Sequence, residues 1–217
     1  MPTRLTVRKG RDCLSLQFFK LERGIQGADV VVIGASAGGL SALSVLLAGL
    51  PADFAAAILI VQHLAPQHKS LLAEILARIS LMPVKQAQEG EAVEPGKVYI
   101  APPDRHLLVS SDRTLTLSQS ELVHFLRPSV DLLFESVATC YKARAIAVVL
   151  TGTGSDGSMG VRAIKKMGGT VIAQDEQSSQ SFGMPRAAIK TGEVDLVLPL
   201  DQIASVLVTL VSGTEDD

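Results

Sequence analysis

The stretch Asp29-Val-Val-Val-Ile-Gly-Ala-Ser-Ala-Gly-Gly-Leu40 decides the fold, because an apolar run typical of a buried strand ends abruptly in a glycine-rich turn. Within it, Gly34-Ala35-Ser36-Ala37-Gly38 matches G-x-S-x-G, in which a sharp turn from strand to helix exposes a serine hydroxyl above a sheet. A helix is predicted to follow from Gly39 to Ala48. Its N-terminus leaves backbone N–H groups unpaired beside Ser36, which suits either a developing oxyanion or a bound phosphate.

Apolar runs of the same kind recur along the chain, and helical patterns lie between them. The strand-type runs are Val30–Ile33, Ala56–Val61, Ala145–Leu150, Thr170–Ala173 and Asp195–Leu198. The helical patterns are Leu40–Ala48, Lys69–Ile79, Val130–Tyr141, Gly160–Met167, Pro185–Lys190 and Gln202–Val211. Strands that alternate with helices of this length predict an α/β fold, in which a doubly wound, mostly parallel sheet is flanked by helices on both faces.

The interval from residue 83 to residue 117 does not follow this alternation. Turn residues in Glu94-Pro95-Gly96-Lys97 and in Ser110-Ser111-Asp112-Arg113 separate short strand-like runs. The interval therefore predicts an antiparallel hairpin insertion near residues 97–117.

Composition favours a single α/β domain. Of the 217 residues, 47% are hydrophobic and 19% are charged, as expected for a sheet covered on both faces. The expected organisation is an N-terminal arm at residues 1–28, the α/β domain at 29–212 and an acidic tail at 213–217. A net charge of −2 without a basic block gives no case for nucleic acid as a partner. No apolar run reaches the about 18 residues that span a bilayer, so we expect a cytoplasmic protein that does not cross the membrane.

Neither a metal nor a cofactor is predicted. Cys13 and Cys140 have no close spacing, and His68 follows His63 by five residues, which does not place both on one face of a helix. A dinucleotide-binding loop would need a second glycine where Ser36 stands, and a P-loop would need a lysine that this turn lacks.

Other polar residues have less evident roles. His106 in the hairpin and His124 in a loop have no obvious carboxylate partner in the sequence, and both are predicted to face solvent. Arg127-Pro128-Ser129 reads as the start of a helix, although an arginine near this edge could also meet an acidic substrate.

Three loops are predicted to share one edge of the sheet, because loops that follow parallel strands all lie at their carboxyl ends. These loops carry Ser36, His63 and Asp156. A serine hydroxyl is a poor nucleophile unless a base such as His63 activates it, and Asp156 would fix the histidine tautomer. The oxyanion would be held by the backbone N–H of Ala37 and by an amide of the glycine loop, near Thr153 or Gly154.

Each of the three residues also has a plainer explanation. Ser36 could be a turn former, His63 could belong to the core, and Asp156 could cap the helix that follows it. The triad is favoured because all three residues follow different strands at the same edge of the sheet.

With these residues the chain resembles the catalytic domain of the chemotaxis protein-glutamate methylesterases, the CheB type. The resemblance runs from about Val30 to Leu210. Its motifs are Ile33-Gly34-Ala35-Ser36-Ala37-Gly38-Gly39, Val61-Gln62-His63, Pro95-Gly96-Lys97-Val98-Tyr99-Ile100-Ala101-Pro102-Pro103, Arg127-Pro128-Ser129-Val130-Asp131, Leu150-Thr151-Gly152-Thr153-Gly154-Ser155-Asp156-Gly157 and Phe182-Gly183-Met184-Pro185-Arg186. The family's nucleophile, base and orienting aspartate fall on Ser36, His63 and Asp156.

The resemblance implies hydrolysis of glutamate γ-methyl esters on the cytoplasmic helices of methyl-accepting chemoreceptors, through an acyl-serine intermediate, and deamidation of glutamine by the same route. Ala37 and Thr153 stand where the best-studied members have threonine and methionine. This combination of residues more closely resembles the methylesterase domains that are fused to a methyltransferase. Family members commonly carry a receiver domain ahead of the esterase, and residues 1–28 are too few for one, so we expect either a fragment of a larger protein or a stand-alone esterase, with a separate receiver or methyltransferase as a candidate partner. The alternative is a catalytically weak or inactive esterase fold that serves as a regulatory module.

Overall fold

The computed structural model describes residues 27–63, 70–123 and 125–212. The acidic tail and nearly all of the predicted N-terminal arm lie outside these ranges, as do Cys13, His68 and His124. In the described part of the chain, no helix is long and apolar enough to cross a membrane.

The predicted parallel sheet is confirmed, and its central strand is β1 (Val30–Ala35). Within the described residues the sheet has seven strands in the order β3-β4-β2-β1-β7-β8-β9, all paired in parallel. The other six strands are β2 (Ala57–Gln62), β3 (Val84–Gln86), β4 (Val98–Ile100), β7 (Ala145–Val149), β8 (Thr170–Gln174) and β9 (Leu196–Leu198). The chain proceeds outward from β1 through β2 on one side and through β7 on the other. The carboxyl end of β1 is therefore the point at which the strand order reverses, and ligands of such sheets generally bind there.

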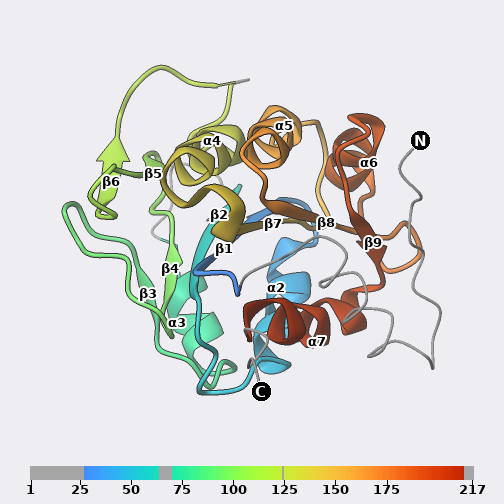
Figure 1. Ribbon diagram of the computed structural model, residues 1–217, viewed down its shortest axis with the longest axis horizontal. Helices are drawn as coiled ribbons and strands as arrows, with labels where there is room; N and C mark the ends of the chain where they lie inside the picture. The colour runs from blue at the N-terminus through green and yellow to red at the C-terminus, as the bar shows by residue number, and fades with distance from the viewer. Residues whose placement is uncertain (1–26, 64–69, 124, 213–217) are drawn as a thin grey trace.

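Helices cover both faces of the sheet, as predicted (Figure 1). One face carries α2 (Gly39–Ala48), α3 (Leu72–Ala77) and α7 (Leu200–Val211), and the other carries α4 (Val130–Tyr141), α5 (Ser158–Lys166) and α6 (Gly183–Lys190). A short 3-10 turn, η1 (Lys142–Arg144), joins α4 to β7. The predicted bounds of α2 and α4 are those observed, whereas α3 is shorter than the pattern at residues 69–79 indicated.

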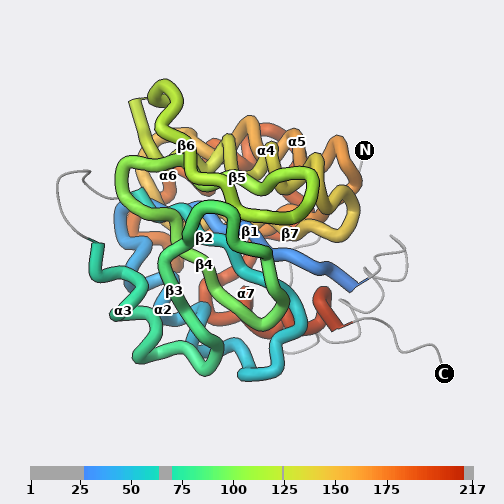
Figure 2. Tube along the Cα trace, turned by 90° about the vertical axis from the view of Figure 1, so that its left-hand side faces the viewer, coloured from blue at the N-terminus to red at the C-terminus, as the bar shows by residue number. Residues whose placement is uncertain are grey.

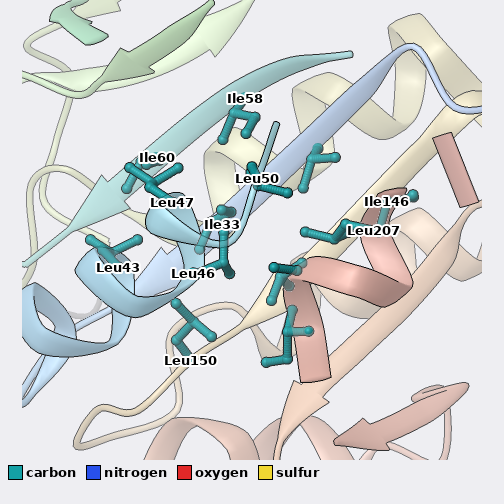
Figure 3. Packing of buried hydrophobic residues seen from close by; sticks show 14 of the residues in the cluster. Ile33, Leu43, Leu46, Leu47, Leu50, Ile58, Ile60, Ile146, Leu150 and Leu207 are labelled. Carbon is teal, nitrogen blue, oxygen red and sulfur yellow. The ribbon is translucent and has the colours of Figure 1, made fainter. Parts of the chain in front are cut away.

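Strand β1 is buried on both faces, which explains why its sequence is continuously apolar rather than alternating. Val31 and Ile33 pack toward α2 and α7, while Val30 and Val32 pack toward α4. Figure 3 shows Ile33 among the leucines of α2 and next to Ile60 of the neighbouring strand. Each such side chain stabilises the fold by about 1.5–3 kcal/mol relative to exposure, so the turn that follows β1 is built on a rigid base.

The predicted antiparallel insertion is also present. It consists of β5 (His106–Val109) and β6 (Leu115–Ser118), which form a separate two-stranded sheet. Figure 2 shows this hairpin beside α4, and Leu107, Val109 and Leu115 are buried in the core on that side. Val98–Ile100, in the same irregular interval of sequence, instead joins the main sheet as the parallel strand β4.

Candidate active site

Ser36 follows β1 directly, and its backbone is tied to the loops on both sides. Its N–H donates to the carbonyl of Thr151 at 3.0 Å, and its carbonyl accepts from Gln62 Nε2 at 2.9 Å. The same carbonyl accepts from the N–H of Gly39, the first residue of α2, at 2.8 Å. The serine is half-buried and therefore reachable from solvent, although its backbone is fixed.

The loop after β7 packs against this serine and requires a glycine at the contact. A Cβ at Gly152 would lie 2.8 Å from Ser36 Cβ and would collide with the sulfur of Met184. Gly152 is held in place on its other side, because its N–H donates to Ser181 at 2.8 Å and its carbonyl accepts from Met184 N–H at 2.8 Å. The motif at residues 182–186 thus supports the loop that lies against Ser36.

His63 follows β2, the strand next to β1. Its N–H donates to the carbonyl of Ala35 at 3.0 Å, and its Nε2 lies 2.8 Å from Asp156 Oδ2. The side chain of His63 is 9% exposed and that of Asp156 is 1% exposed. With Nε2 committed to the carboxylate, Nδ1 is the nitrogen left to take a proton. The predicted pairing of His63 with Asp156 is therefore present in the structure.

The other pairing of the triad, between Ser36 and His63, stays a prediction. Ala35 and Gln62 are register partners, so Ser36 and His63 stand at the ends of adjacent strands. Within the described residues, no hydrogen bond joins Ser36 Oγ to the imidazole. Such bonds are often long in the absence of substrate and tighten when it binds.

Asp156 is surrounded by donors from the start of α4. Its Oδ1 accepts from Ser129 Oγ at 2.9 Å and from Asp131 N–H at 3.0 Å, and its Oδ2 accepts from Val130 N–H at 2.7 Å. Burial by itself would raise the pKa of Asp156, but the hydrogen bonds from His63 and from these backbone N–H groups hold it below the usual value. The carboxylate therefore stays ionised at neutral pH, as an orienting partner for histidine must.

The simpler explanation of Asp156, a cap on the helix that follows it, is wrong. Asp156 binds the N-terminus of α4 rather than that of α5. The reverse contact also exists, because Asp131 in the first turn of α4 accepts from Gly160 N–H of α5 at 2.8 Å. Burial and the neighbouring charge of Asp156 raise the pKa of Asp131 to about 6. A carboxylate next to each helix thus accepts hydrogen bonds from the N-terminal turn of the other helix. Of these two carboxylates, Asp156 also binds His63.

The prediction that His106 faces solvent is wrong as well. The side chain is fully buried, its Nδ1 accepts from Ser129 N–H at 3.1 Å, and its Nε2 lies 3.1 Å from the carbonyl of Glu121. Burial, and to a smaller degree the charge of Arg127, lower the pKa of His106. The prediction considered only carboxylate partners that a sequence can reveal by their spacing. Both partners of His106 are instead backbone groups of a loop that is distant in the sequence.

A pocket of about 260 Å³ opens beside His63. Its lining is mainly apolar, and consists of His63, Asp104, Leu122, Phe125, Leu126, Arg127 and Pro128. Phe125 is 93% exposed and has a φ of 63°, which a phenylalanine seldom adopts. Backbone strain of this kind is concentrated at functional sites.

Arg127 does not offer a free charge to this pocket. Its Nε and Nη2 donate to Asp104 Oδ1 at 2.9 and 2.7 Å, and its Nη1 donates to the carbonyls of Gln119 and Ser120. The suggestion that Arg127 meets an acidic substrate is therefore not favoured, because its guanidinium already holds the loop.

The two predicted oxyanion donors lie on the same edge of the sheet. Ala37 and Gly154 are exposed, and in the described part of the chain their N–H groups donate to no protein acceptor. The carbonyl of Ala37 is fixed by Thr151 Oγ1 at 2.9 Å. Their role as oxyanion donors stays a prediction.

Among residues 27–63, 70–123 and 125–212, no group of three or more histidine, cysteine or acidic side chains is suited to hold a metal. Cys140 lies in α4, half-buried, and its Sγ donates to the carbonyls of Val109 and Ser110. Ser36, His63 and Asp156, which follow three strands of the sheet, are of the residue types found in the triad of a serine hydrolase.

Comparison with known proteins identifies the family to which this chain belongs. The model of the CheB methylesterase family matches residues 31–207. The crystal structure of the Thermotoga maritima CheB methylesterase catalytic domain superposes with a TM-score of 0.83 at 41% identity, covering 85% of this chain and 100% of that one. The chain belongs to the CheB methylesterase family.

Curated relatives agree with this assignment. A protein-glutamate methylesterase/protein-glutamine glutaminase of Moorella thermoacetica is 43% identical over 86% of this chain and 45% of its own length. A Leptospira interrogans protein, whose name assigns the same two activities provisionally, is 41% identical over 84% of this chain and 94% of its own.

Proposed function

We propose that this protein is a serine hydrolase that removes methyl groups from glutamate γ-methyl esters of a signalling receptor, with Ser36 as nucleophile. The observation that carries the proposal is the buried His63–Asp156 pair, joined at 2.8 Å beside a G-x-S-x-G turn. A histidine oriented by an ionised carboxylate is the base that a serine hydroxyl needs.

The proposed reaction gives each of these groups a role. His63 Nδ1 takes the proton from Ser36 Oγ as the oxygen attacks the ester carbonyl, and the N–H groups of Ala37 and Gly154 stabilise the oxyanion. The tetrahedral intermediate collapses, the protonated His63 gives its proton to the methoxide, and methanol leaves. Water, activated by the same histidine, then hydrolyses the acyl-serine and releases a glutamate carboxylate. Asp156 stays ionised throughout and stabilises the charged imidazole.

A primary amide enters the same sequence of steps with ammonia as the leaving group. Relatives are named as protein-glutamine glutaminases as well as methylesterases. We therefore extend the proposal to glutamine side chains at the same receptor positions. Amides are less reactive than esters, so this activity should be the slower one.

The apolar pocket beside His63 fits a helical protein substrate. Phe125 and Leu122 present exposed apolar surface next to the catalytic pair, where the side chains that flank an esterified glutamate on a helix would lie. We infer that the substrate is the cytoplasmic helical region of a methyl-accepting chemoreceptor, so that the enzyme acts in the cytoplasm. A separate receiver protein or methyltransferase is the proposed regulatory partner.

The direct test is methanol release from a methylated receptor by the purified protein. The expected result is turnover by the parent and loss of turnover in Ser36→Ala, with unchanged thermal unfolding. A serine-reactive phosphonate separates the enzyme from an inactive regulatory module, because labelling requires an activated Ser36 hydroxyl. Labelling that persists in His63→Ala, or no methanol from the parent, would reject the proposal.

A further inference from the structure

The loop between Glu121 and Ser129 supplies most of the pocket, and its two ends meet at one buried imidazole. The structure describes residues 121–123 and 125–129 of this segment, hereafter the pocket loop. His106 Nδ1 accepts from Ser129 N–H at one end, and His106 Nε2 faces the carbonyl of Glu121 at the other, both at 3.1 Å. His106 comes from β5, so a residue of the hairpin closes a loop that lies outside it.

Only one form of the imidazole satisfies both partners. The Ser129 N–H can only donate, so Nδ1 must be unprotonated, and the Glu121 carbonyl can only accept, so Nε2 must carry the proton. Protonation of Nδ1 would set two donors against each other in a fully buried place. The low pKa that burial gives His106 is consistent with this neutral form. The charged groups that act on it are Arg127, which opposes protonation, and Asp156 and Asp104, which favour it.

Ser129 extends the contact to the catalytic pair. Its N–H binds His106, and its hydroxyl donates to Asp156 Oδ1 at 2.9 Å, while Oδ2 of the same carboxylate binds His63. Ser129 is itself fully buried. A chain of hydrogen bonds therefore runs from His106 through Ser129 and Asp156 to His63.

We propose that His106 is a positioning residue for substrate recognition and catalysis, which fixes both ends of the pocket loop and so couples the pocket to Asp156. The proposal rests on the proposed function, since the pocket matters only for a substrate larger than the ester itself. One bond of the imidazole positions Phe125 and its neighbours through Glu121. The other positions Asp156 through Ser129. Arg127 provides further ties to the loop, so loss of His106 should loosen the pocket without removing it.

Two substitutions separate the two bonds. The side-chain oxygen of His106→Asn can occupy the place of Nδ1 and keep the bond from Ser129, whereas the amide nitrogen of His106→Gln can occupy the place of Nε2 and keep the bond to Glu121. Two substrates report on the two effects: p-nitrophenyl acetate, which needs only the catalytic groups, and a helical peptide that carries one glutamate γ-methyl ester.

The expected result is a split between KM and kcat. His106→Asn should raise KM for the helical ester about tenfold and change kcat much less, because the loop end at Glu121 is released. His106→Gln should lower kcat on both substrates by about 10- to 100-fold, with KM changed much less, because Asp156 loses a fixed neighbour. The matched control is Tyr99→Phe, which removes a buried side chain's two hydrogen bonds to the backbone, at Ala92 and Glu94, on the same side of the sheet. It should lower the melting temperature and leave both kinetic constants as in the parent.

Equal changes in KM and kcat in both variants, or changes in melting temperature alone as in the control, would overturn the proposal. A measurement on the parent guards against variants that do not fold. Nitrogen NMR of the histidine-labelled protein should show His106 neutral, with its proton on Nε2, at every pH where the enzyme is active, and a proton on Nδ1 would overturn it. If the parent cleaves p-nitrophenyl acetate but not the helical ester, the proposed substrate fails, while the kcat comparison still tests the bond to Ser129.

Discussion

Two regions meet at His63, and they differ in almost every physical respect. On one side lies Asp156, buried, with four hydrogen-bond donors directed at its two oxygens. On the other side lies the pocket, where Phe125 is 93% exposed on a strained backbone. The first region is already organised for the reaction, which is where electrostatic catalysis gains most. The second offers apolar surface that only a bound partner can bury, which suits recognition of a large substrate.

The largest effect is expected when the negative charge of the buried Asp156 is removed. Asp156→Asn should keep the fold but lower kcat by about 10³- to 10⁴-fold, because the amide would donate to His63 Nε2 and leave the proton on Nδ1. The histidine could then no longer accept a proton from Ser36. Hydrolysis of p-nitrophenyl acetate measures the loss, and circular dichroism checks the fold. A loss smaller than about tenfold would mean that Asp156 does not orient the base.

A change in the packing behind Ser36 should have the second-largest effect on the rate. Gly152→Ala introduces a methyl group that meets Met184 and approaches Ser36 Cβ, so the serine or the loop must move. A displacement of about 1 Å at a reacting atom can cost about 100-fold in rate, and a loss of this order is expected in kcat. Gly192→Ala is the control, since its positive φ of 83° makes the change strained but no atom lies near the new methyl group. That variant should be destabilised, by about 1 kcal/mol, without loss of rate.

The open side should respond only to large substrates. Phe125→Ala should raise KM for a helical peptide ester about tenfold more than it raises KM for p-nitrophenyl acetate, because the lost contact lies beyond the reacting group. Leu81→Ala tests whether any exposed apolar residue has this effect, since Leu81 is 67% exposed and is not part of the pocket lining. Equal changes on both substrates would place Phe125 among the groups that organise catalysis instead.

The same comparison explains what could be predicted from the sequence. Ser36, His63 and Asp156 could be placed at one edge because the strand pattern fixes the direction of every parallel strand, and direction alone fixes where the following loops lie. That rule needs no knowledge of side-chain packing. The bounds of α2 were also predicted correctly, because the glycine-rich turn and the apolar helix that follows it are both local features of the sequence.

The hydrogen-bond partners of Asp156, in contrast, could not be predicted from the sequence. Ser129 and the first N–H groups of α4 reach Asp156 only because α4 and α5 pack side by side, and nothing local in the sequence specifies that contact. His106 was predicted to face solvent for the same reason. Its partners lie 15 and 23 residues away and are backbone groups, which any sequence can supply. A motif at residues 127–131 was visible, but its local pattern indicated a helix start and not a support for the catalytic carboxylate.

The remaining prediction concerns Asp131 in the first turn of α4 and Asp156 in the loop before α5, whose contributions to stability depend on pH with opposite sign. The pKa of Asp131 is raised from 3.8 to about 6, so the folded state holds a proton that the unfolded state has already lost between these values. Its contribution to stability is therefore present below about pH 4 and is lost as the pH rises through 6. Asp131→Asn should gain stability relative to the parent over this window, by at most about 3 kcal/mol, since one pKa unit corresponds to about 1.4 kcal/mol.

Asp156 should show the opposite slope. Its pKa is lowered in the folded state, so its contribution is present at neutral pH and disappears as the pH falls through the folded value. Urea unfolding of the parent and Asp131→Asn at pH 4, 5, 6 and 7 measures the first trend, and unfolding of the parent and Asp156→Asn from pH 5 down to pH 2 measures the second. The Asp131→Asn difference should grow in favour of the variant as the pH rises from 4 to 7, and the stability advantage of the parent over Asp156→Asn should shrink as the pH falls below the usual value of 3.8. Parallel trends in the two variants would mean that the pair titrates as one unit, and the contrast between an ionised orienting carboxylate and a neutralised neighbour would be wrong.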